Sequence, residues 1–150
     1  MKVNARDVIT FPDGILGFPF AKRFALLSFR QDFPLLSWLQ SLEEPDLAFV
    51  VINPKQVRPD YHPSVSKDDL AALGLKDLSE AEMYALVSVS PGAKRITANL
   101  VGPLVVNRRL GIGRQVVLVG DDYSVKHDIL EEWRLYAKET LNSRVKRKGA

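Results

Sequence analysis

Short apolar runs separated by turn-forming residues account for most of the chain. Strand-length runs of this kind occur at residues 8–11, 24–29, 35–41, 47–52, 83–89 and 115–119. Gly, Pro, Asn or Asp residues lie between most of them, as expected of strands joined by tight turns. The run at 47–52 is almost wholly apolar, which is typical of a strand buried on both faces. The pattern predicts a mainly β fold, an antiparallel closed or partly closed barrel or sandwich of short strands.

The segment 97–107 departs from a simple strand pattern. Asn99 and Asn107 bracket an apolar run, and the pair Gly102-Pro103 divides that run in two. Asn is depleted in strands, and Pro cannot donate a hydrogen bond to a sheet. We therefore expect two short strands that meet at a corner, with the asparagine amides bonded to irregular backbone.

Two helices are predicted. The first lies between Ser66, a typical N-cap, and Gly74, a typical C-terminal cap. The second follows Ser124, taken as its N-cap, because apolar residues then recur at helical spacing through Trp133 to Leu141. The expected organisation is a β-barrel domain over residues 1–125, followed by an amphipathic helix and basic tail over 126–150. This second part belongs to the same domain or extends from it.

Composition and charge narrow the class of protein. The chain of 150 residues is 46% hydrophobic, which is ordinary for a globular domain, and it has no cysteine for disulfides or thiolate metal sites. No apolar run approaches the roughly 20 residues of a membrane span, and no apolar signal core is seen, so we expect a cytoplasmic protein. Residues 126–150 hold seven Lys or Arg and four Asp or Glu. The remaining residues are neutral overall, so the barrel is not expected to bind nucleic acid.

The residue patterns predict no catalytic chemistry. His62 and His127 lack partners at metal-binding spacing. The Gly-x-Gly at 111–113 lacks the third glycine and the following helix of a dinucleotide site, so we interpret it as a hairpin turn. No serine lies in a nucleophile elbow. We expect no enzyme activity, no cofactor, no metal and no small-molecule substrate; a binding module is the interpretation that remains.

Six segments in order resemble one known family. They are the opening run at 9–18 (ITFPDGILGF), LQSL at 39–42, LAFVVINP at 47–54, Asp60-Tyr61, the corner at 97–107, and QVVL at 115–118. This set is similar to the FliW flagellar assembly factor family over about residues 3–123. Gly102 replaces the usual Ala, and the Trp133 helix and basic tail extend beyond the family's pattern. The residues that carry the resemblance are Phe11, Gly14, Gly17, Phe18, Gln40, Phe49, Pro54, Asn99, Pro103 and Asn107.

The resemblance implies a non-enzymatic regulator of flagellin production. Proteins of this family bind the translational repressor CsrA at a site apart from its RNA-binding surface and so relieve repression of flagellin translation. They also bind flagellin, which frees CsrA in a partner-switch feedback loop. The resemblance implies these two protein partners, with no direct contact to nucleic acid and none to a membrane.

Loops and hairpin tips are where we expect partner contact, because binding residues concentrate there. The candidates are Asp60, Tyr61 and His62 in a Pro-rich loop, and Lys94, Arg95, Arg108 and Arg109 at hairpin tips. Five aromatic residues are expected to fill the barrel instead: Phe11, Phe18, Phe29, Trp38 and Phe49. The alternative function is direct RNA binding through the basic tail at 144–150, which would weaken steeply with salt.

Overall fold

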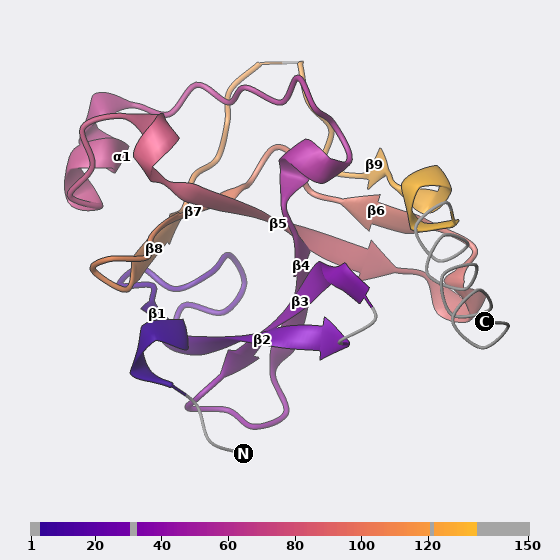
Figure 1. The fold of residues 1–150 in the computed structure, drawn as a ribbon, viewed down its shortest axis with the longest axis horizontal. Helices are drawn as coiled ribbons and strands as arrows, with labels where there is room; N and C mark the ends of the chain where they lie inside the picture. The colour runs from indigo at the N-terminus through magenta and orange to yellow at the C-terminus, as the bar shows by residue number, and fades with distance from the viewer. Residues whose placement is uncertain (1–3, 31–32, 121, 135–150) are drawn as a thin grey trace, which may run out of the picture.

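A ring of seven hydrogen-bonded strands forms the body of the molecule (Figure 1). The computed structural model describes residues 4–30, 33–120 and 122–134. Around the ring the order is β4-β3-β2-β1-β8-β7-β5, closed by pairing of β5 with β4, and β6 and β9 continue the sheet beyond β5. Every pairing is antiparallel except β1 with β8. The strands are β1 (Val8–Thr10), β2 (Arg23–Arg30), β3 (Phe33–Ser41), β4 (Ala48–Ile52), β5 (Glu82–Val89), β6 (Ile96–Ala98), β7 (Leu104–Asn107), β8 (Ile112–Gln115) and β9 (His127–Asp128).

The predicted mainly β barrel is confirmed, and five of the expected strands match β1 to β5 within two residues. The strand expected at 115–119 is wrong in its position, because β8 ends at Gln115. The turn covers residues 108–111 and ends with Gly111 at φ +67°, whereas Gly113 is inside the strand. A Cβ at Gly113 would lie 2.6 Å from the ring of Phe11, so the missing side chain lets that ring reach the barrel interior.

The corner at 97–107 forms as predicted. The strands β6 and β7 end and begin on either side of it. The Asn99 Oδ1 accepts hydrogen bonds from the backbone N–H groups of Val101 and Gly102, both at 3.0 Å. The buried Asn107 donates from Nδ2 to the Leu73 carbonyl at 2.8 Å. Both amides therefore serve irregular backbone that would otherwise lack a partner.

The barrel core is built from aliphatic side chains and a few rings. Phe11 is fully buried and meets Phe24 edge to face, with ring centroids 5.7 Å apart. Burying such a side chain stabilises the fold by about 2–3 kcal/mol. Phe49 packs against the same cluster, whereas Phe29 and Trp38 are half-buried and stack on each other. The prediction that Phe18 fills the barrel is wrong, because its side chain is 40% exposed.

Helices lie outside the ring. In α1 (Lys67–Ala72) the Ser66 hydroxyl caps the N-terminus by accepting from the Asp69 N–H, and Gly74 follows the helix with φ +69°, both as predicted. Short 3-10 turns form η1 (Ala5–Asp7), η2 (Pro54–Gln56), η3 (Leu78–Glu80) and η4 (Pro91–Ala93).

The second helix begins later than predicted. Its first described residue is Leu130, whose N–H donates to Asp128 Oδ1. Ser124 is therefore not its N-cap, because β9 pairs with β6 between the two points. Trp133 packs against the core cluster beneath β6. The rest of the predicted helix and the basic tail lie outside the described residues.

Candidate partner-binding surfaces

The loop between η2 and α1 contains three of the predicted contact residues, and Tyr61 is the one that anchors it. Tyr61 is 1% exposed, and its hydroxyl donates to the Leu100 carbonyl at 2.7 Å. Burial raises the pKa of Tyr61 well above its usual range, with a smaller rise from Tyr123. The side chain ties the loop to the corner after β6, so in this conformation it offers no surface to a partner.

Asp60 and His62, by contrast, remain at the surface. Asp60 is paired with Arg58, whose Nε lies 3.3 Å from the carboxylate. The same guanidinium lies over the Tyr123 ring and donates to the Asp122 carbonyl at 2.9 Å. The His62 backbone N–H donates to the Tyr123 hydroxyl. These contacts hold the loop against the segment that precedes β9.

A cavity of about 260 Å³ opens beside His62. Its walls come from the loop before α1, from α1 itself, and from the chain that follows β8. The lining residues are His62, Ser64, Ser66, Asp69, Val101, residues 116–120, Asp122 and Tyr123. The loop predicted from the sequence therefore borders this cavity.

The basic hairpin tips differ from one another. Lys94 and Arg95 are exposed beyond η4, while Arg109 is exposed in the turn after β7. Figure 1 places these two tips on opposite sides of the barrel, so they do not form one basic patch. Arg108 is only partly exposed, and its guanidinium lies 3.4 Å from the Asp7 carboxylate and 3.7 Å from that of Glu82. It joins η1 to β5, which leaves it little freedom for a partner.

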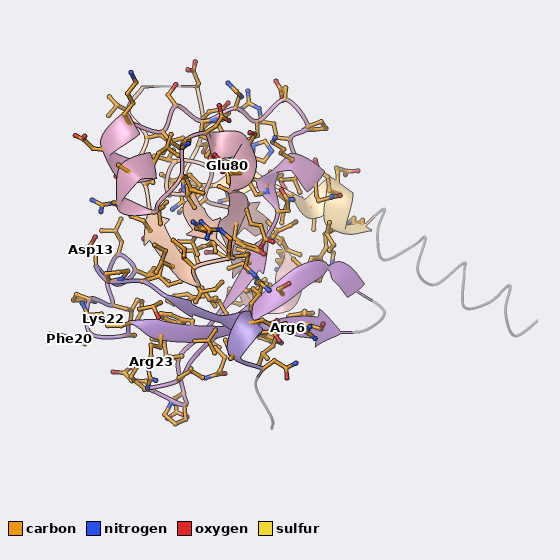
Figure 2. All side chains as sticks on the ribbon, turned by 60° about the vertical axis from the view of Figure 1, so that its left-hand side comes forward. Arg6, Asp13, Phe20, Lys22, Arg23 and Glu80 are labelled. Carbon is orange, nitrogen blue, oxygen red and sulfur yellow. The ribbon has the colours of Figure 1, made fainter. Side chains whose placement is uncertain are left out.

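An apolar loop between β1 and β2 is a surface that the sequence reasoning missed. Leu16 is 69% exposed and Phe20 85% exposed, and Figure 2 shows Phe20 at the outer edge of the molecule near Asp13 and Lys22. The loop is held in shape by the Leu16 N–H, which donates to Gln115 Oε1, and by Phe18, whose ring meets Phe49 edge to face. A rigid exposed aromatic is a typical anchor for a protein partner. The sequence feature that indicates this exposed loop is Phe-Pro-Phe at residues 18–20, which follows two glycines.

The other residues that carry the family resemblance stabilise turns of the fold. Gln40 donates from Nε2 to the carbonyls of Ser41, Pro45 and Leu47, which fixes the turn after β3. Pro54 is buried at the start of η2, and Pro103 is buried at the corner. These side chains shape turns and do not form an exposed patch.

Neither a metal cluster nor a membrane helix is found in the part of the chain that the structure describes. No group of three or more His, Asp or Glu residues there is arranged to hold a metal ion. No helix within the same residues is long and apolar enough to cross a membrane.

Comparison with known proteins decides the family. The family model described as FliW protein matches residues 1–129. This chain belongs to the FliW family. The resemblance found in the motifs is thereby confirmed, and the match continues through β9.

Curated FliW relatives cover nearly the whole chain. The flagellar assembly factor FliW of Leptospira interrogans (serogroup Icterohaemorrhagiae serovar Lai) is 38% identical over 133 residues, 87% of each chain. That of Natranaerobius thermophilus is 40% identical over 88% of this chain and 87% of its own. A crystal structure of the flagellar assembly factor FliW superposes with a TM-score of 0.78 at 30% identity, covering 86% of this chain and 89% of the other. The fold is therefore shared over the same length as the sequence.

Proposed function

We propose that this chain is a flagellar assembly factor that acts in the cytoplasm by binding CsrA and flagellin in turn. The observation that carries the proposal is the family match over residues 1–129, together with relatives named as flagellar assembly factors. CsrA and flagellin are the partners that the family resemblance implies. The surfaces described above suit a protein that binds other proteins. They consist of a rigid apolar loop and a polar cavity on a closed barrel, with Phe20 and His62 exposed for contact.

The regulation would arise from competition between two complexes. Free chain binds CsrA and lowers its affinity for the flagellin transcript, from a site on CsrA apart from the RNA. Accumulating flagellin occupies the chain and releases CsrA. CsrA and flagellin compete for the same chain. The fraction of CsrA released therefore depends on the ratio of their two dissociation constants and on the concentrations of both proteins.

Size-exclusion chromatography of purified proteins tests the proposal. The chain mixed with CsrA should elute as a complex, as should the chain mixed with flagellin, and excess flagellin should move CsrA back to its free position. A chain that elutes alone in both mixtures at micromolar concentration would refute the proposal.

Direct RNA binding is the second candidate function, favoured by the excess of Lys and Arg in residues 126–150. It predicts an affinity for RNA that falls steeply as salt rises and disappears when residues 144–150 are deleted. The proposed protein-binding function predicts that this deletion leaves the complexes with CsrA and flagellin intact. Comparing the full chain with this deletion variant therefore separates the two candidate functions.

A further inference from the structure

The four residues after β8 form an extended segment that is paired on one side. We refer to residues 116–119 as the open edge. The Val116 N–H donates to the Pro103 carbonyl at 2.9 Å, and the Leu118 N–H donates to the Val101 carbonyl at 2.8 Å. In an extended chain the N–H and C=O groups of the intervening residues point to the other side. Those of Val117 and Val119 therefore face away from the corner.

These outward groups have no partner among the residues that the structure describes. Among the described residues, the backbone of Val117 and Val119 makes no hydrogen bond, and their side chains are 58% and 101% exposed. Proteins commonly protect such an edge with a charged residue, a proline or a bulge. The open edge reads Val-Val-Leu-Val and contains neither a charge nor a proline. It is therefore a template on which another strand can pair.

The cavity of about 260 Å³ beside His62 lies along the open edge, since residues 116–120 line it. This volume is below the roughly 300–1,000 Å³ of typical small-molecule sites. A strand-adding peptide needs only a shallow space beside an edge, because its affinity comes mainly from main-chain hydrogen bonds. Ser64, which also lines the cavity, adds a hydroxyl group that can bond to a peptide backbone.

The charged residues that line the cavity indicate which kind of peptide can bind along the open edge. Asp69 and Asp122 are the charged residues among those that line the cavity. The Asp69 carboxylate is already paired with Arg114 at 2.9 Å, whereas that of Asp122 has no ion pair within the described residues. A partner segment with a Lys or Arg is complementary.

We propose that the open edge binds an extended segment of a protein partner by strand addition, with a basic side chain of that segment directed to Asp122. The inference rests on the proposed function, because the segment belongs to CsrA or to flagellin. It adds the mode of recognition: main-chain pairing at Val117 and Val119, with alternate side chains of the segment over the cavity.

Removing the outward N–H of Val117, with a side chain of similar size kept in place, tests the proposal. Val117→Pro removes an N–H that makes no bond within the described protein, and Val117→Thr is the matched variant that keeps it. Binding of purified CsrA and purified flagellin is measured by calorimetry for both variants and for the unmodified chain. We expect Val117→Pro to weaken one of the two complexes about tenfold or more and Val117→Thr to change it less than threefold. Asp122→Asn should weaken the same complex about two- to fourfold at low salt.

Several outcomes would overturn the inference. If Val117→Pro binds both proteins as tightly as the unmodified chain, strand addition is wrong while the proposed function stands. Equal losses in the Pro and Thr variants would mean a side-chain contact instead of main-chain pairing. If the unmodified chain binds neither protein, the proposed function fails and this inference fails with it.

Amide hydrogen exchange provides a measurement that needs no variant, in case Val117→Pro does not fold. The Val117 and Val119 amides should exchange rapidly in the free protein and slowly in the complex. Unchanged rapid exchange at both amides in a saturated complex would also overturn the inference.

Discussion

Removing the Asn107 amide should destabilise the fold measurably, because this side chain connects the corner to the end of α1. Asn107 is 4% exposed; its Nδ2 donates to the Leu73 carbonyl at 2.8 Å, and its Oδ1 accepts from the Leu110 N–H at 3.3 Å. In Asn107→Ala the Leu73 carbonyl loses its hydrogen-bond donor. Leu73 is only 2% exposed, so water cannot readily replace that donor. Leaving a buried acceptor unpaired costs about 1–3 kcal/mol. The Leu110 N–H lies near solvent, so its loss adds about 0.5 kcal/mol.

The sum predicts that Asn107→Ala lowers the free energy of unfolding by about 1.5–3.5 kcal/mol. Urea denaturation followed by Trp fluorescence measures it, and the slope m should stay unchanged because the same surface is exposed on unfolding. Asn107→Leu separates the hydrogen bonds from simple filling of space, since it keeps a side chain of similar size without the amide. It should be about as unstable as the alanine variant.

Asn4→Ala is the control, because Asn4 is exposed and its side chain makes no capping hydrogen bond. It should change the unfolding free energy by less than about 0.5 kcal/mol. An Asn107→Leu protein as stable as the unmodified chain would refute the reasoning, since packing alone would then explain the residue.

Three further predictions follow from the turns, the buried tyrosine and the apolar loop. Gly14→Ala should cost about 2–4 kcal/mol in urea denaturation, because φ is +70° and a Cβ would lie 2.8 Å from the Phe18 carbonyl oxygen. Gly17→Ala, with nothing near its Cβ, should cost only about 1 kcal/mol; equal losses would contradict the steric argument. Because burial raises the pKa of Tyr61, the unfolded chain loses that proton first as pH rises, so stability should fall above pH ~10, and less steeply in Tyr61→Phe; identical slopes would count against it. Phe20→Ser should leave the melting temperature within about 2 °C and weaken a partner complex roughly tenfold, as calorimetry would show; unchanged binding of both partners would remove the loop as an interface.

Apolar runs were sufficient to locate the strands β1 to β5, because each run is long enough to bury one face and most of the runs are followed by turn-forming residues. The misplaced strand after Gly111 shows the limit of that rule. Gly113 reads locally as a turn residue, yet it lies in β8 because the ring of Phe11, distant in sequence, needs the space. Likewise Ser124 resembles a helix cap, but pairing of Thr97 with Asp128 places β9 between Ser124 and the helix.

The candidate surfaces were harder to predict, because exposure depends on contacts between distant residues. Tyr61 resembles an interface residue until its hydroxyl is seen to meet the Leu100 carbonyl. Arg108 resembles a free cation until its neighbours Asp7 and Glu82 are known. Phe18 is the opposite case, because its apolar side chain predicts a core position whereas its loop extends outside the barrel. His62 lies in an exposed loop, as the sequence predicts, because the prolines around it mark a segment without regular structure.

The most direct test of the central claim is fluorescence anisotropy of a labelled flagellin-transcript leader bound to CsrA. Adding this chain should lower the anisotropy as CsrA releases the RNA, and adding flagellin afterwards should restore it. The chain alone should leave the anisotropy of the free RNA unchanged. An anisotropy of the CsrA–RNA complex that stays constant at saturating chain, or that rises because the chain itself binds the RNA, would contradict the account.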